Sequence, residues 1–216
     1  MWRIDPNSPL FRASDGVIIR LLDMAQSVFA IGEGPHRDQS WHSENAEHRR
    51  AVRLSIERLR SLLDRYASEA GPITYFLRIR DAAETMFGAL IALDQTFIDQ
   101  VGPARERLDV ARAFRGALLL VWSSTLRDGG FHSRTIQRSK VRVGRLRRRL
   151  TNEVFIGCTI ALEQALDILS GPDPDVSTLE LPQAKADRLR ARSIPAAILH
   201  QALRQAAGLE QFHIDR

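Results

Sequence analysis

The stretch ITYFLRIRDAAETMFGALIALDQTFIDQV, residues 73–101, decides the fold class. Apolar side chains recur along its whole length at spacings of three and four residues, and no Pro interrupts it, which predicts a single α-helix. Its apolar residues are too many for one surface stripe, so we expect a central helix that packs on several sides. Gly71-Pro72 precedes the stretch and Gly102-Pro103 follows it, and these pairs mark its two ends.

Helical periodicity also dominates on either side of this stretch. The first expected helix has its N-cap at Ser14 or Asp15 and ends at Gly32, and Pro103 suits the first turn of the fourth. The fifth contains no Pro, so the sequence predicts one long helix, with Gly144 and Thr151 left open as places for a break. The four flanking helices are expected at residues 14–32, 43–70, 103–127 and 133–169.

The sequence from Gly171 to Pro174 is the clearest linker in the chain. We therefore predict a main helical bundle over residues 1–170 and a C-terminal helical pair over 179–216, either separate or packed on the same bundle. The pair would comprise residues 182–192 and 195–207. Strand-like alternation is absent beyond a few residues, so the expected fold is all-α, a bundle of about seven helices with one long basic helix.

The composition fits a folded chain in a reducing compartment. Apolar residues make up 44% of the 216 residues, and the single cysteine, Cys158, lies in an apolar run and is expected in the core. The longest purely apolar run, residues 117–122, is far below the roughly 20 residues that a membrane-spanning helix needs. The N-terminal residues lack the continuous apolar core of a secretory signal peptide. We expect a cytoplasmic protein with no membrane partner.

No sequence pattern indicates a reaction. The common nucleotide-binding, zinc-protease and serine-hydrolase motifs are missing, so we expect no enzyme activity and no cofactor. His42 and His48 share a segment with two glutamates, but their spacing matches no common zinc pattern, so no metal site is predicted. Trp41, in a polar stretch, is a modest candidate for stacking on a base or a partner surface.

The most unusual stretch is SRTIQRSKVRVGRLRRRL, residues 133–150, which contains eight cations and no acid. The whole chain carries a net charge of +5, and a basic protein favours anionic partners such as nucleic acid. The predicted binding residues are the eight cations of this stretch. They are Arg134, Arg138, Lys140, Arg142, Arg145, Arg147, Arg148 and Arg149.

Five of these cations follow one another at intervals of 4, 4, 3 and 4 residues, which places them on one face of a helix. We call them the Arg row: Arg134, Arg138, Arg142, Arg145 and Arg149. An apolar stripe is expected elsewhere on the same helix, formed by Ile136, Val143, Leu146, Leu150 and Val154. The sequence thus predicts an amphipathic helix that docks by its apolar side and presents guanidinium groups spaced much like the phosphates of a nucleic-acid strand.

Other interpretations stay open at this point. The segment could be an ordinary solvated face whose charges are neutralised from other helices, or a lipid-facing helix. Residues 126–150 also have the turn, the Ser cap and the basic helix of a helix-turn-helix. The acids that could neutralise the Arg row are Asp94, Asp99, Glu106, Asp109, Glu163 and Asp167.

A second basic group is expected to be neutralised locally. Its five arginines alternate with glutamates at helical spacing, which predicts ordinary i, i+4 ion pairs. These arginines are Arg49, Arg50, Arg53, Arg58 and Arg60, and the acids are Glu44, Glu47 and Glu57.

An all-helical, basic chain with an Arg row from Arg134 to Arg149 resembles the small helical subunits of CRISPR effector complexes. The resemblance rests on overall character and on the Arg row, and covers no aligned motif. It implies stacked helical bundles that offer basic faces to guide–target duplexes or to a displaced strand.

The sequence therefore favours a non-catalytic helical subunit that binds RNA or DNA along its phosphate backbone within a ribonucleoprotein complex, beside other protein subunits. One alternative is a dimeric DNA-binding transcriptional regulator that uses the basic segment as its reader helix. The other is a helical adaptor whose basic face binds an acidic protein.

Overall fold

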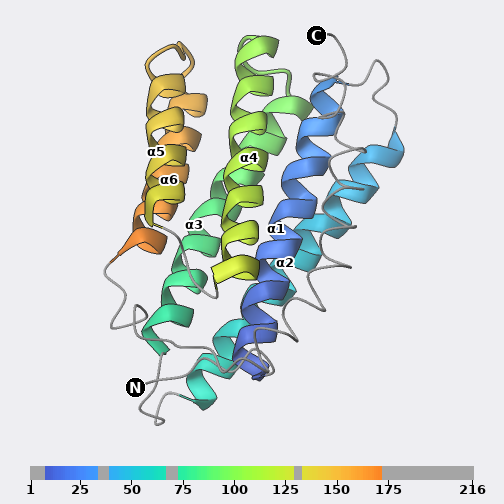
Figure 1. The fold of residues 1–216 in the computed structure, drawn as a ribbon. Coiled ribbons are helices and arrows are strands. Elements are labelled where there is room, and N and C mark those ends of the chain that lie inside the picture. Colours follow the sequence, from blue (N-terminus) through green and yellow to red (C-terminus); the bar gives the residue numbers. More distant parts are fainter. Residues whose placement is uncertain (1–7, 34–38, 67–72, 129–132, 172–216) are drawn as a thin grey trace, which may run out of the picture. The chain divides into compact units, whose positions relative to one another are not determined.

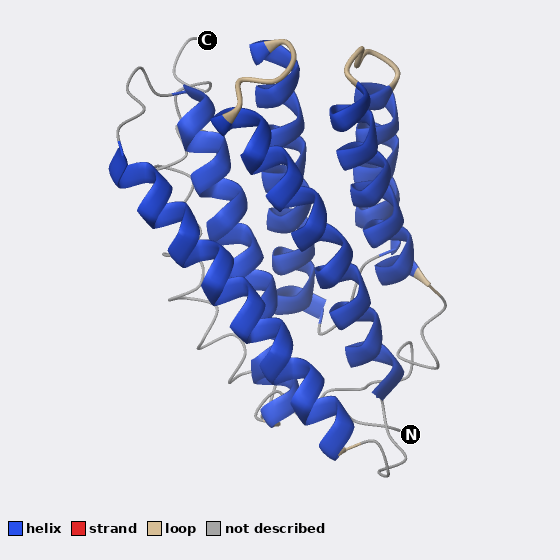
Figure 2. Cartoon of the chain, turned by 180° about the vertical axis from the view of Figure 1, so that it is seen from behind, coloured by secondary structure: helices blue, strands red, loops and turns tan. Residues whose placement is uncertain are grey.

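The computed structural model describes residues 8–33, 39–66, 73–128 and 133–171, and it gives side-chain positions for most of them. The regular secondary structure of this part of the chain is all helix, with no strand (Figures 1 and 2). The six helices are α1 (Pro9–Glu33), α2 (Gln39–Arg65), α3 (Ile73–Ile98), α4 (Ala104–Asp128), α5 (Ser133–Arg147) and α6 (Glu153–Ser170).

The central position predicted for residues 73–101 is confirmed. Helix α3 packs against α1, α2, α4 and α6, while α1 lies between α2 and α4 and α5 lies against α4 and α6 (Figure 1). Side chains from several faces of α3 are fully buried, among them Phe76, Leu90 and Phe97. A helix that is apolar on more than one side gains most by burial between neighbours, and this is why α3 occupies the middle of the bundle.

The first helix begins earlier than predicted, because Ser8 caps it. The Ser8 hydroxyl accepts a hydrogen bond from the amide of Phe11 at 3.1 Å, and Pro9 takes the first helical position. Ser and Pro in these two places are typical of a helix N-terminus. Ser14 and Asp15, the predicted caps, lie inside α1 instead.

The single long helix predicted over residues 133–169 is wrong, because the chain turns between α5 and α6. Of the two candidate break points, the one at Thr151 is correct, and Gly144 lies within α5. Asn152 is the N-cap of α6, and its side chain accepts a hydrogen bond from the amide of Val154 at 2.9 Å. Asn and Thr offer the backbone an alternative to continued helix, which explains a break without Pro or Gly.

The change of direction also alters the predicted apolar stripe. Ile136, Val143 and Leu150 are buried, as expected for the docked side of α5. Val154 is predicted in the same stripe, but its side chain is 40% exposed, because the turn resets the helical phase before α6 begins. The predicted C-terminal helical pair and the predicted linker after Gly171 lie outside the described residues.

Candidate nucleic-acid interface

Helix α5 is held in the bundle by its side opposite the Arg row. Ile136 and Val143 are 2% and 3% exposed and face the neighbouring helices α4 and α6. Their positions along the helix differ by seven residues, about two turns, so they mark one stripe. Because this stripe is buried, the opposite face of α5 is the one that meets solvent.

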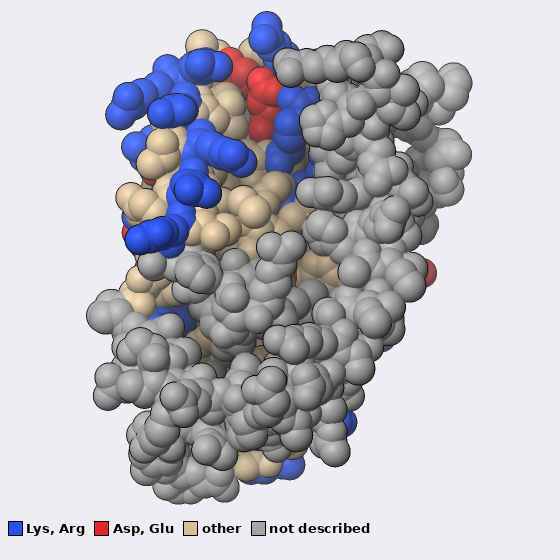
Figure 3. Space-filling model, viewed as in Figure 1, with Lys and Arg blue, Asp and Glu red and all other residues tan. Residues whose placement is uncertain are grey.

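All five members of the Arg row are exposed. Four of them lie in α5, and Arg149 lies in the turn directly after it. None of the five forms an ion pair within 4.0 Å with an acid among the residues that the structure describes. Figure 3 shows the same concentration as a cluster of basic side chains over α5 and the end of the α5–α6 turn.

Two of the eight predicted binding residues face the protein instead. Lys140 forms an ion pair with Asp167, and Arg147 places a guanidinium nitrogen 2.9 Å from a carboxylate oxygen of Glu163. Both acids belong to α6, so these ion pairs connect the two helices on the side away from the Arg row. Lys140 and Arg147 are therefore better explained as contacts that fix α5 on α6 than as ligand contacts. Arg148, like Arg149, is exposed in the turn.

The six acids that could have neutralised the Arg row contact other groups. Asp94 is fully buried beside α2, and Asp99 accepts hydrogen bonds from Gln95. Asp109 pairs with Arg112 on its own helix at 2.9 Å. Glu163 and Asp167 bind the two cations on the α6 side, and Glu106 binds backbone amides of the turn. The described structure thus provides no intramolecular counter-charge for the row.

The ion pairs predicted within the second basic group differ from those observed. Arg49 lies 3.5 Å from Asp94 and Arg60 lies 2.7 Å from Glu84, and both acids belong to α3. Arg50, Arg53 and Arg58 are exposed without an ion pair to another described residue. The i, i+4 prediction considered only α2 itself, whereas two carboxylates on a packed neighbour lie closer to the guanidinium groups.

The arrangement of α4 and α5 does not favour a helix-turn-helix. The two helices pack against each other, and the sequence colours of Figure 1 show that they run in opposite directions. In a helix-turn-helix the two helices cross at roughly 90–120°, so that the second can project into a groove. Here the Arg row lies along the side of a bundle, which suits contact with a phosphate backbone better than insertion between base edges.

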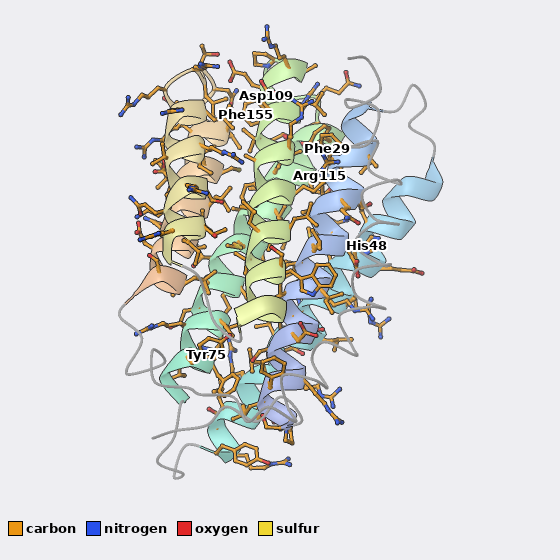
Figure 4. All side chains as sticks on the ribbon, viewed as in Figure 1. Phe29, His48, Tyr75, Asp109, Arg115 and Phe155 are labelled. Carbon is orange, nitrogen blue, oxygen red and sulfur yellow. The ribbon has the colours of Figure 1, made fainter. Side chains whose placement is uncertain are left out.

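Two arginines of α4 are structural. Arg107 is 5% exposed and donates to the carbonyls of Thr96 and Val101 at the C-terminal end of α3. Arg115 is 6% exposed, and its guanidinium carbon lies 3.7 Å from the ring centroid of Phe29. Figure 4 shows this stacked pair between α4 and α1. Buried arginine is normally paired or stacked, and these contacts explain why the two do not join the exposed surface.

In the described part of the chain, no group of three or more His, Cys, Asp and Glu is placed to hold a metal ion, and no helix has the length and hydropathy to span a bilayer. Cys158 is 3% exposed, which confirms it as a core residue, and burial raises the pKa of its thiol to about 11. The side chains of Trp41 and His42 lie outside the described residues.

No protein-family model matches the chain, and neither a curated protein nor a solved structure shows significant similarity to it. The charge and geometry of α5 are therefore the features of the molecule that indicate a function.

Proposed function

We propose that this protein is a non-catalytic, helical nucleic-acid-binding subunit of a ribonucleoprotein complex, and that the Arg row contacts the phosphate backbone. One observation carries the proposal: four exposed guanidinium groups lie along one side of α5 and a fifth is exposed in the turn that follows, and none of the five has a carboxylate of the described chain within 4.0 Å. The resemblance to small helical subunits of CRISPR effector complexes is part of the same proposal.

The spacing of the row supports a polyanion rather than a single anion. Arg134 and Arg145 are eleven residues apart, which is about 16 Å along a helix that rises 1.5 Å per residue. Neighbouring members are about 5–6 Å apart, close to the separation of successive phosphates on a strand. One guanidinium group can donate two hydrogen bonds to two oxygens of the same phosphate. Each member of the row can therefore contact a phosphate of its own.

The like charges on α5 are unfavourable in the free protein. Arg134, Arg138 and Arg142 follow at intervals of four residues, and each such pair of equal charges costs a few tenths of a kcal/mol. A phosphate strand would remove this repulsion and release the counterions that it carries itself. Binding should therefore weaken steeply with salt.

The test compares two matched triple variants. The first reverses three members of the row, Arg138→Glu, Arg142→Glu and Arg145→Glu, and the second makes the same charge change on α2. Because the first variant replaces three phosphate-binding groups, its affinity for a labelled 20-base-pair RNA or DNA duplex, or for a 20-nucleotide single strand, should fall at least about 100-fold at about 0.1 M salt. The control is Arg50→Glu, Arg53→Glu and Arg58→Glu, all exposed without a described ion pair.

The proposal requires the α5 variant to bind far more weakly than the α2 variant, and to show a shallower dependence on salt. Equal decreases in affinity would mean that only net charge matters and would remove the assignment to α5. Wild-type protein that binds none of the probes would overturn the proposal. In that case the ultraviolet absorbance ratio of the complex purified from cells shows whether nucleic acid is present. A ratio typical of protein alone would favour the adaptor that binds an acidic protein.

A further inference from the structure

The turn between α5 and α6 is fastened to α4 by one carboxylate. Glu106, in the first turn of α4, accepts hydrogen bonds from the amide of Thr151 at 3.1 Å and from its hydroxyl at 2.7 Å. It also accepts a hydrogen bond from the amide of Asn152 at 3.2 Å. These amides lie just before α6, where backbone donors have no partner within the helix. A single acid in the first turn of α4 thus accepts hydrogen bonds from the start of α6.

The surroundings of Glu106 leave this corner little freedom. Gly102, just before α4, has φ +67°, and a Cβ there would come within 2.8 Å of Phe155 and 2.9 Å of the Asn152 side chain. The turn before α4 therefore packs directly on the start of α6. Figure 4 places Asp109 and Phe155 near this end of α4 and α6. Arg107 fixes the same turn from the other side through the carbonyls of Thr96 and Val101.

The turn that Glu106 holds contains the last two cations of the basic stretch 133–150. Arg148 and Arg149 are exposed and lie three and two residues before Thr151. They belong to no helix, so their direction depends on the turn rather than on α5 alone. The turn has its own hydrogen bond from the amide of Arg149 to the carbonyl of Leu146 at 2.8 Å, and Glu106 supplies the link to a second element.

The position of Glu106 is unexpected for a surface that binds anions. A negative charge beside exposed arginines repels phosphate, and by charge alone its removal should strengthen binding. The carboxylate, however, is occupied by three donors of the turn. Glu106 can therefore strengthen the binding of an anion, although its charge alone would weaken it.

We infer that Glu106 is a positioning residue for the proposed nucleic-acid surface, because it holds the α5–α6 turn so that Arg148 and Arg149 continue the row of α5. This inference rests on the proposed function. The proposed binding surface then extends beyond α5. The four members of the Arg row that lie in α5 are followed by Arg148 and Arg149, whose positions depend on the contact of the turn with α4. Glu106 forms no described ion pair with the row, so its effect is exerted through Thr151 and the backbone of Asn152.

The experiment uses the full chain and the same labelled duplexes and single strand. Glu106→Ala removes the acid and the anchor together, and Glu106→Gln removes the charge but keeps one acceptor oxygen for Thr151. Asp109→Ala is the matched control, because Asp109 is an acid one turn further along α4 that pairs only with Arg112 among described ion pairs. Circular dichroism and hydrogen exchange at the Thr151 and Asn152 amides monitor the fold and the turn.

We expect Glu106→Ala to weaken binding about fivefold or more and to lower the salt slope by about 1 to 2, the contribution of one or two phosphate contacts. Glu106→Gln should fall between Glu106→Ala and wild type, and Asp109→Ala should bind as wild type or slightly tighter. In a background of Arg148→Ala and Arg149→Ala, Glu106→Ala should no longer weaken binding, since the residues that it positions are gone.

The outcomes separate the two proposals. If reversal of the α5 residues abolishes binding while Glu106→Ala and Asp109→Ala both tighten it equally, the positioning role is overturned and the proposed function stands. The same holds if Glu106→Ala weakens binding equally with and without Arg148 and Arg149. If wild type binds none of the probes, or the α5 reversal changes nothing, the proposed function itself fails.

Discussion

Helices α2 and α5 are both rich in arginine, yet the structure uses their arginines differently. On α2, Arg49 and Arg60 reach acids of α3, and the exposed side of the helix mixes arginine with Glu57 and Asp64. On α5, Lys140 and Arg147 pair with α6, and the exposed side carries arginine without any acid. The comparison shows that the number of cations on a helix says little until the neighbouring helices are known.

The difference has an energetic side. An arginine that reaches a buried acid belongs to the fold, and removing its partner leaves polar groups without hydrogen bonds in the interior. An arginine on an exposed face that carries other arginines and no acid gains no ion pair on folding and is slightly repelled by its neighbours. Stability measurements on variants of the two helices therefore test whether their arginines differ in this way.

The largest effect is expected at the buried end of the α2–α3 contact. Asp94 is fully buried, accepts a hydrogen bond from the Asn45 side chain at 2.6 Å and lies 3.5 Å from Arg49. Asp94→Ala would leave the Asn45 amide without this acceptor and should lower the free energy of unfolding by about 2–4 kcal/mol, measured by urea denaturation. A decrease below about 1 kcal/mol would show that α2 does not depend on this contact.

A smaller, pH-dependent effect is expected where α4 holds the end of α5. The hydrogen bond from the Thr151 hydroxyl, followed by those from the Thr151 and Asn152 amides, lowers the pKa of Glu106 below its ordinary value of 4.5. The ionised carboxylate thus favours the folded state. This contribution is complete above the pKa of the unfolded chain and is lost as the pH falls through the lower pKa of the folded state.

Glu106→Gln should lack this pH-dependent contribution, so the stability difference between wild type and variant should shrink as the pH is lowered from about 6 to about 3. Urea denaturation of both proteins across that range measures it. Because Glu106 is only half-buried, whereas Asp94 is fully buried, the effect should be smaller than that of Asp94→Ala. A difference that stays constant with pH would contradict the shifted pKa.

The smallest effect is expected on the Arg row itself. Arg142→Ala should change the free energy of unfolding by no more than about 0.5 kcal/mol, and relief of repulsion from Arg138 and Arg145 should make the change stabilising. Arg49→Ala on α2, by contrast, should destabilise, because Arg49 faces Asp94. If Arg142→Ala costs as much as Arg49→Ala, Arg142 takes part in the fold and the comparison fails.

Much of the fold follows from local patterns. The helical class, the central place of residues 73–98, and the Gly-Pro pairs beside both ends of α3 and the start of α4 are all visible in the sequence, because spacing and helix breakers act over a few residues. The start of α1 is also visible there, since Ser8-Pro9 is a strong N-terminal signal. The predicted start was too late because Ser14 or Asp15 was chosen as the N-cap.

The candidate site is predicted in part. Spacing alone identifies the Arg row, because residues three and four apart on a helix share a face. The same stretch also supplies Lys140 and Arg147, and nothing local distinguishes these two from the others. Their acids, Asp167 and Glu163, lie 27 and 16 residues further along the chain, on a helix whose register depends on the turn.

Helical periodicity is a property of neighbouring residues, and for this reason local patterns are enough to predict that this protein is helical and that one segment carries a row of arginines on a single face. The place where that segment turns, and the arginines that find carboxylates, were fixed by the tertiary structure. It also decided that Glu106, 45 residues before Thr151, holds the turn. Ion pairs and caps between helices depend on packing geometry, and contacts between residues far apart in the chain leave no local pattern in the sequence.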